Sequence, residues 1–421
     1  MSDKGANSKY LLSVHALTFI VSILTTVILP KALNNVDYIE AMKLMAVVNV
    51  IIPICSFGLP TYLMRYYSCN KSNLISNIFL LGFTGLILSF ILLTIFSSVS
   101  ELSIKVVILV LFIAFISSLF SISGSLGRIT QSLSLYFTST FTPKLLLLCS
   151  IMICLYYIRK PIDYSLYLEL WLLVSIVTLF FVAGKVRALN KISSLDKKND
   201  NKNNLTYKTS LFFCVPLVFS NLMAMFLPLV ERYLLQGLIA PEQMVLYLFN
   251  LDFFSKVSGV MLLTLKVVVF PKIILLPENR KVEAFKKYLK LCVLFAIGLI
   301  LISPLLTYFF HNVILKPLGH SDLFDKYVSI VMIVYTLILS INYMVLIGLV
   351  IINKNKYLII TTTLTLVLHV AGIYILSPKY GALGASLSLL ISSIVSVIVL
   401  FLITYKGIDG FQKNNHKIYK A

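Results

Sequence analysis

Long apolar segments alternate with short polar ones along the whole chain. A run of about 18 or more mainly apolar residues is long enough to cross the hydrocarbon core of a bilayer as a helix. The chain holds twelve such runs, at 11–30, 44–64, 76–97, 104–123, 133–157, 164–184, 209–230, 244–270, 289–310, 328–352, 357–376 and 382–404. The pattern predicts an all-α integral membrane protein of about 12 transmembrane helices, with both termini on one side of the membrane.

One polar stretch is much longer than the others. Residues 185–208, with the sequence KVRALNKISSLDKKNDNKNNLTYK, separate six predicted helices from the next six. The predicted organisation is an N-terminal lobe over 1–184, a linker over 185–208, a C-terminal lobe over 209–404 and a basic tail over 405–421. Lys and Arg gather in the linker, in the tail and in the loops on their side. Because cytoplasmic loops carry the excess of Lys and Arg, these segments and both termini are predicted to be cytoplasmic.

Composition excludes several classes of protein. The chain is 59% hydrophobic and 12% charged, far from the roughly 25% charged residues of soluble domains. The net charge of +20 does not indicate nucleic-acid binding, because the basic residues lie in short tracts between apolar runs. The sequence contains no phosphate-binding P-loop, no G-x-S-x-G nucleophile motif and no metal-spaced cluster of His or Cys. The sequence therefore favours a transporter over an enzyme, without a bound cofactor or metal.

Three ionisable residues interrupt the predicted helix 244–270. At 100° per residue, Asp252, Lys256 and Lys266 share a helix face about 80° wide. A charge facing lipid at the bilayer centre costs about 2.5–3.5 kcal/mol, so this face is predicted to line the bundle interior or a water-filled cavity. Two interpretations stay open: Asp252 and Lys256 form an ion pair that holds helices together, or they belong to a cationic lining with one titratable carboxylate. Lys266 either joins that lining or extends its ammonium group to the membrane surface.

A second intramembrane lysine lies in the predicted helix 133–157. Pro143 is expected to kink this helix, and Tyr136, Thr140 and Lys144 share one of its faces at steps of four residues. A lysine near mid-membrane is hard to explain by packing, so Lys144 is predicted to face the interior as a cation.

Two histidines and two arginines complete the candidate residues. His15 and His369 each lie on a stripe of small and hydroxyl side chains, which serves either helix packing or ion coupling. Arg65 and Arg128 close the second and fourth predicted helices on the cytoplasmic side. Each either anchors its helix at the membrane surface or contacts an anionic head group there.

Several stretches resemble a known family. FGLPTYLMRYY (57–67), LPLVERYLLQGLIAPEQMVLYLFNLDFF (227–254), FPKI (270–273) and YGALGASLSLL (380–390) resemble segments of polysaccharide exporters in the multidrug/oligosaccharidyl-lipid/polysaccharide (MOP) superfamily. Helix number, loop lengths and motif order extend the likeness over the chain, which is most similar to the Wzx-type O-antigen flippases. Glu231 stands where that family more often has Asp.

The resemblance implies two six-helix lobes around a central cavity, as in MATE-like transporters. It also implies translocation of an undecaprenyl-pyrophosphate-linked oligosaccharide, used in O-antigen and lipopolysaccharide biosynthesis, across the bacterial inner membrane by alternating access. Lys144, Lys256 and Lys266 would attract the pyrophosphate, and Arg65 and Arg128 would receive it at the cytoplasmic mouth. Asp252, His15 and His369 would be candidates for proton or sodium coupling. Membrane lipid, the O-antigen polymerase and the chain-length regulator would be partners; nucleic acid would not.

Three rival functions remain. A cation-coupled multidrug exporter of the same superfamily would favour an anionic cavity, whereas the intramembrane residues here are mainly lysines. A membrane O-antigen polymerase or ligase would carry a long outer loop, which the chain lacks. The related peptidoglycan-precursor flippases usually have more than twelve helices.

Overall fold

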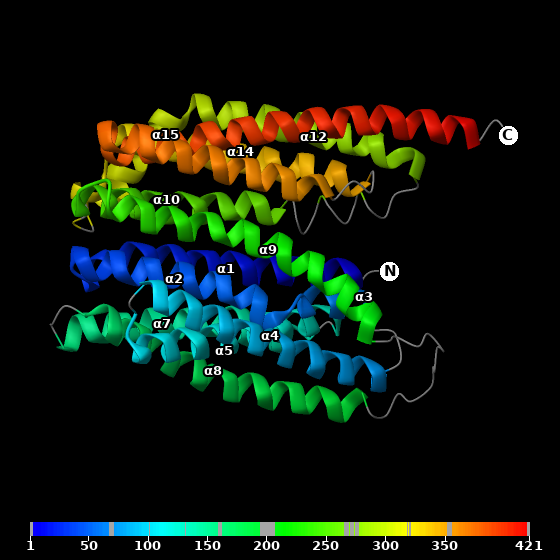
Figure 1. The fold of residues 1–421 in the computed structure, drawn as a ribbon, viewed down its shortest axis with the longest axis horizontal. Helices are drawn as coiled ribbons and strands as arrows, with labels where there is room; N and C mark the ends of the chain where they lie inside the picture. The colour runs from blue at the N-terminus through cyan, green and yellow to red at the C-terminus, as the bar shows by residue number, and fades with distance from the viewer. Residues whose placement is uncertain are drawn as a thin grey trace. The chain divides into compact units, whose positions relative to one another are not determined.

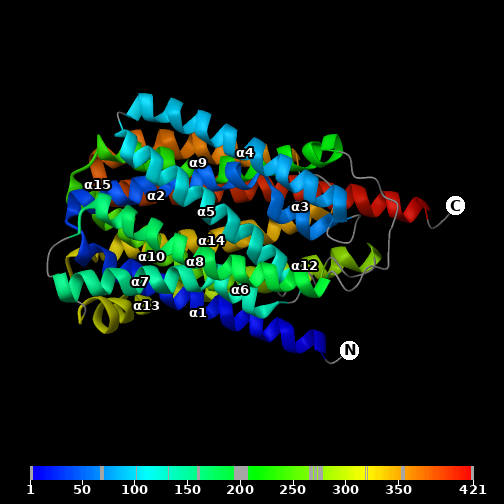
Figure 2. The same cartoon turned by 90° about the horizontal axis from the view of Figure 1, so that it is seen from below.

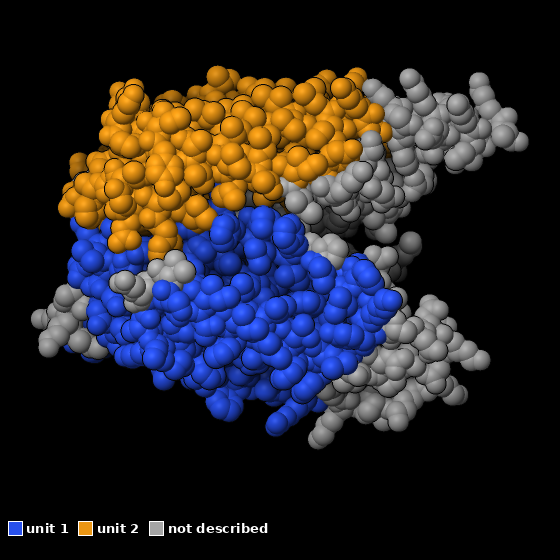
Figure 3. All heavy atoms as spheres, in the orientation of Figure 1, with its two compact units in different colours: residues 1–229 blue, residues 230–421 orange. Residues whose placement is uncertain are grey.

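In the structure, a computed structural model, the regular elements of the described residues are all helices, with no strand among them. These residues are 3–418 apart from 67–70, 101, 131, 159–161, 194–206, 265–268, 270–272, 274–277, 318, 320 and 352–355. The side chains of some further residues beside these gaps, that of Arg65 included, also lie outside the description. The chain divides into two compact units, Met1–Leu229 and Val230–Ala421, coloured separately in Figure 3.

The first unit is built around α5, which packs on α2 and α8; the three helices lie side by side in Figures 1 and 2. Ile116 and Phe120 of α5 are buried with Leu135 and Val182 from its neighbours. The elements of this unit are α1 (Asp3–Ala32), α2 (Asn35–Ser56), α3 (Leu59–Tyr66), α4 (Lys71–Ser100), α5 (Ile104–Ile129), α6 (Leu133–Thr140), α7 (Thr142–Ile153), the π-helix η1 (Cys154–Ile158), α8 (Tyr164–Ser193) and the first part of α9 (Tyr207–Gln236).

The second unit is centred on α14, on which α10, α12 and α15 pack (Figure 1). Met344, Val345 and Ile347 of α14 are buried against Phe285 of α12 and Leu400 of α15. The elements are the end of α9, α10 (Pro241–Thr264), α12 (Glu278–Leu301), α13 (Ser303–Phe309), the π-helix η3 (Phe310–Leu315), the 3-10 helix η4 (Ser321–Leu323), α14 (Lys326–Ile351) and α15 (Lys356–Ile418).

The apolar helices agree with a multi-pass membrane protein. Within the described residues, eight helices are long and apolar enough to cross a membrane, and nine if the bent pair Val282–Leu301 and Ser303–Val313 forms one span. One of the eight, Ile360–Gly407, covers most of two predicted spans, 357–376 and 382–404. The predicted spans 209–230 and 244–270 lie along α9 and α10, which include side chains outside the description. The all-helical membrane fold expected from hydropathy is confirmed.

Within the described residues, helix breaks interrupt the predicted spans 44–64, 133–157 and 289–310, and a kink lies between the last two predicted spans. Phe57 and Gly58 have φ angles of 44° and 70°, which ends α2 and starts α3 inside the predicted span 44–64. Pro143 at the start of α7 separates it from α6, because proline has no N–H for the helical ladder. The bend of 58° between α12 and α13 occurs at a Ser–Pro pair, and α15 kinks at Gly381, whose φ is 55°.

The boundary between the two units lies inside α9, after Leu229, whereas the sequence pattern divides the chain at 185–208. The first half of α9 is bound to the first unit by a polar contact in its interior. The Tyr62 hydroxyl lies 2.7 Å from the Ser210 hydroxyl, and Asn77 donates to Ser210 over 3.1 Å. The part of α9 up to Leu229 therefore belongs to the first unit, and its last turns belong to the second.

Two predicted polar segments are partly helical. α8 continues into the predicted linker as far as Ser193, and residues 194–206 lie outside the described part of the chain. α15 continues through most of the predicted tail, to Ile418.

Candidate functional site

The turn between α5 and α6 positions the first group of candidate residues. α5 ends at Ile129, and Ser132 accepts a hydrogen bond from the Leu135 N–H to cap α6. A Cβ at Gly127 would lie 2.9 Å from the Tyr136 backbone nitrogen, so only glycine lets the two helices approach this closely. This close approach places Tyr136 beside Arg128.

Three side chains meet here, His15 of α1, Arg128 of α5 and Tyr136 of α6, and Lys144 of α7 acts electrostatically on His15. We call these four residues the cationic cluster. Figure 2 shows α6 and α7 alongside α1. The Arg128 guanidinium carbon lies 5.7 Å from the centroid of the Tyr136 ring, within range of a cation–π interaction. The Tyr136 hydroxyl is hydrogen-bonded to Nε2 of His15, with the two rings edge to face at 5.3 Å. Arg128 and Lys144 both act electrostatically on His15.

Burial differs sharply within the cationic cluster. Tyr136 is 1% exposed and His15 is half-buried, whereas Arg128 and Lys144 are exposed. Tyr136 and His15 are thus held in place by burial and by their hydrogen bond, while the Arg128 and Lys144 side chains are exposed to an anion in solution. The structure brings together three predicted site residues, His15, Arg128 and Lys144, although they come from three different predicted helices.

The hydroxyl residues that follow His15 along α1 have a different role. Thr18, Ser22 and Thr26 are buried, and each donates to the backbone carbonyl four residues earlier, over 2.6, 2.7 and 3.1 Å. Their hydroxyl groups are satisfied within the helix, which agrees with the packing interpretation of this stripe. His15 departs from the stripe because it contacts Tyr136.

The second group lies on α10. Lys256 Nζ donates to Asp252 Oδ2 over 2.6 Å, one helical turn apart, and their side chains are 24% and 18% exposed. The ion pair that the sequence left as one of two interpretations is therefore formed. Lys266 lies outside the described residues, and Arg65 lies on α3 with its side chain outside them. The structure thus tests neither of these two residues as part of a site.

A third group is buried in the second unit. His369 of α15 is 0% exposed and Glu231 of α9 is 1% exposed. Nε2 of His369 lies 3.2 Å from Glu231 Oε2, and its Nδ1 lies 2.9 Å from the Ser388 hydroxyl. Gly372 makes the second contact possible, because a Cβ there would lie 2.4 Å from Ser388 Oγ. We call Glu231 and His369 the buried carboxylate–imidazole pair.

Sequence reasoning missed Glu231 as a site residue. The predicted span ended at 230, which placed Glu231 in an outer loop, but α9 continues to Gln236 and buries it. Helix boundaries predicted from hydropathy are uncertain by two to four residues. Extending the predicted helix by one residue would have included Glu231.

No protein-family model and no curated protein matches the sequence. Solved structures do match over almost the whole chain. A Vibrio cholerae MATE transporter, the VcmN D35N mutant, has a TM-score of 0.60 at 14% identity and covers 97% of this chain and 99% of its own. A MOP superfamily transporter from Pyrococcus furiosus has a TM-score of 0.56 at 14% identity, covering 96% and 95%. The lipid II flippase MurJ in its inward closed conformation has a TM-score of 0.63 at 16% identity, covering 95% and 87%. The chain therefore has the fold of MATE transporters and of a lipid II flippase.

Proposed function

We propose that the chain is a flippase that moves an undecaprenyl-pyrophosphate-linked oligosaccharide from the cytoplasmic to the periplasmic leaflet of a bacterial inner membrane by alternating access. The observation that carries the proposal is the cationic cluster. Arg128 and Lys144 are exposed beside the fixed Tyr136 and His15, in a segment of high hydropathy. The proposed transport cycle needs no cofactor. The proposed orientation in the membrane is the one predicted from the distribution of Lys and Arg, with both termini cytoplasmic.

The chemistry of the cationic cluster fits a pyrophosphate. Guanidinium and ammonium groups donate charge-assisted hydrogen bonds to phosphate oxygens, and arginine can donate two in parallel. Tyr136 holds Arg128 from one side, which limits the side-chain freedom lost when an anion binds. The polyprenyl chain can stay in the lipid while the pyrophosphate and sugars cross, so only the head group needs polar contacts.

The other charged groups fit two further roles in the same cycle. The Lys256 ammonium group is paired with the Asp252 carboxylate at 2.6 Å. It would therefore bind the substrate's phosphate only when that ion pair opens. A proton taken up by His369 would turn its contact with Glu231 into a buried ion pair. Proton binding there would change the packing of α9 against α15, which is the kind of change that ion coupling requires.

The MATE fold also favours a second candidate, a cation-coupled multidrug exporter. The two proposals differ in the sign of the ligand. An exporter of organic cations would gain affinity when Arg128 or Lys144 is neutralised, whereas a pyrophosphate flippase would lose it.

Complementation of a strain of the native host that lacks this chain tests the function. Arg128→Ala and Lys144→Ala are expected to leave surface polysaccharide below a tenth of the level restored by the unsubstituted chain. The matched controls, Arg187→Ala and Lys31→Ala, remove exposed cations of α8 and α1 that lie outside the cationic cluster. Full restoration by both cluster variants would exclude the cluster as the pyrophosphate site. Failure of the unsubstituted chain to restore export would exclude the flippase function.

A further inference from the structure

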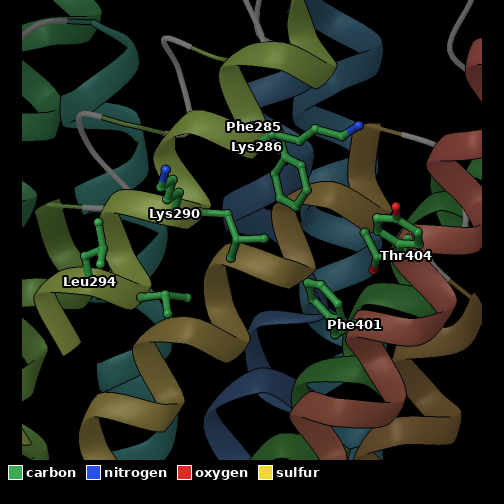
Figure 4. Close-up of a pocket in the computed structure, with 9 residues that line it drawn as sticks. Phe285, Lys286, Lys290, Leu294, Phe401 and Thr404 are labelled. Carbon is green, nitrogen blue, oxygen red and sulfur yellow. The ribbon is translucent and has the colours of Figure 1, made fainter. Parts of the chain in front are cut away.

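A cavity of about 510 Å³ lies in the second unit between α12 and α15 (Figure 4). Two lysines and several apolar side chains form its wall. The residues that the argument uses are Phe285, Lys286, Lys290 and Leu294 of α12, with Phe401 and Thr404 of α15. Neither the cationic cluster nor the buried carboxylate–imidazole pair contributes to this wall.

Two of the side chains that line the cavity, Phe285 and Thr404, pack against α14. A Cβ at Gly348 would lie 2.6 Å from Thr404 Cγ2 and 2.7 Å from Phe285 Cζ, so glycine lets both side chains rest against the α14 backbone. Thr404 is 2% exposed, and its hydroxyl makes no hydrogen bond within the described part of the chain. A buried hydroxyl without a partner is costly in a protein interior.

The two lysines give one end of the cavity a positive charge. Lys286 and Lys290 are exposed, one helical turn apart, and neither forms an ion pair within the described part of the chain. Figure 4 shows both side chains in the upper half of the view, with their nitrogens pointing to opposite sides and with Leu294 and Phe401 further down. The cavity is thus cationic at one end and apolar along the rest of its length.

The predicted topology places the cationic end at the cytoplasmic membrane surface. The first turns of α12 follow a predicted cytoplasmic loop, and α15 enters the predicted cytoplasmic tail at residue 405. Basic pockets between membrane helices on the cytoplasmic side are suited to anionic lipid head groups.

We propose that this cavity binds one anionic phospholipid of the cytoplasmic leaflet. Its phosphate lies between Lys286 and Lys290, and the start of an acyl chain follows Leu294 and Phe401. A zwitterionic phospholipid fits less well, because its own ammonium group opposes the two lysines. A polyprenyl pyrophosphate with sugars would need a polar wall for the oligosaccharide, and this wall is mainly apolar.

The test uses the full chain in mild detergent, with retained lipid counted by native mass spectrometry during titration with dioleoyl phosphatidylglycerol. Lys286→Ala and Lys290→Ala are each expected to weaken binding about fivefold. Lys287→Ala is the matched control: it removes an exposed lysine from the same turn of α12, one that does not line the cavity. Leu294→Trp keeps both charges and places a larger side chain in the apolar part, so it is also expected to weaken binding.

Three results would overturn the proposal: equal loss in Lys287→Ala and the two lining variants, equal retention of dioleoyl phosphatidylcholine, or unchanged binding in all variants. Inorganic phosphate tests whether the cavity binds any anion without requiring a lipid. If millimolar inorganic phosphate fully displaces the phospholipid, the proposal is also overturned. Tighter binding of undecaprenyl pyrophosphate than of the phospholipid would reassign the cavity to the substrate. Unfolding temperatures within a few degrees of the unsubstituted chain establish that each variant is folded. Because the readout is lipid binding, it stays informative if the proposed flippase function fails.

Discussion

Truncating Arg128 tests the cationic cluster most directly. The side chain is exposed at the end of α5, and its guanidinium group lies over Tyr136 rather than in the packed interior. Arg128→Ala removes that charge and leaves the close contact at Gly127 and the Ser132 cap of α6 in place. The substitution is therefore expected to change ligand binding without unfolding the turn.

The size of the effect follows from the hydrogen bonds lost. A hydrogen bond to a charged group contributes about 1.5–3 kcal/mol, and 1.4 kcal/mol is a tenfold change in affinity. Because Arg128 is exposed and screened by water, the lower part of this range applies. We expect Arg128→Ala to weaken binding of undecaprenyl pyrophosphate roughly 10- to 30-fold. Arg128→Lys keeps the charge but loses the paired donors, so a smaller loss is expected.

The assay is a binding titration of the chain in nanodiscs of phosphatidylcholine, with undecaprenyl pyrophosphate as ligand and undecaprenol as the uncharged reference. Undecaprenol binding should not change, because it has no phosphate to contact. Arg187→Ala removes an exposed arginine of α8 and should bind as the unsubstituted chain does. If Arg128→Ala binds pyrophosphate within twofold of the unsubstituted chain, the cationic cluster is not the head-group site.

Three further substitutions test the other groups. Glu231→Ala leaves Nε2 of His369 buried without its partner, so the free energy of unfolding should fall by about 1–3 kcal/mol; an unchanged thermal unfolding curve in detergent would contradict the contact. Gly384→Ala places a Cβ 2.3 Å from a backbone carbonyl oxygen of α15, and should reduce the folded yield in size-exclusion chromatography, whereas Gly298→Ala meets nothing within 4 Å and should not. Asp252→Asn removes the negative half of the α10 ion pair and should tighten pyrophosphate binding about fivefold in the nanodisc titration; unchanged affinity would place this pair outside the substrate path.

The fold was predictable because the membrane leaves the chain few alternatives. Backbone groups in lipid must be hydrogen-bonded within their own segment, so a long apolar run in an all-α chain becomes a helix. The breaks within spans were less predictable. The break at Pro143 is predictable from the proline itself. The break at Phe57 requires a positive φ at a bulky residue, which no local preference favours.

The candidate site was predictable only in part, for a related reason. Helical periodicity places Tyr136 and Lys144 on one face, since both lie in the same predicted span. It cannot show that Tyr136 meets His15, 121 residues away, or that Glu231 meets His369, 138 residues away. Such pairings depend on which helices are neighbours, and the helical periodicity of a single sequence does not contain that information.

The six charged or titratable residues of the three groups described above differ in burial and in ion pairing. Asp252 and Lys256 neutralise each other at 2.6 Å, so an incoming anion must first compete with a carboxylate. Glu231 and His369 are at most 1% exposed, which leaves a proton or a small ion as their exchangeable partner. Arg128 and Lys144 alone among these six side chains are exposed; Arg128 lies over the Tyr136 ring, and both cations act electrostatically on His15. The cationic cluster therefore offers an anionic head group the more exposed cations, which is why substitutions there test the proposed substrate more sharply than substitutions on α10.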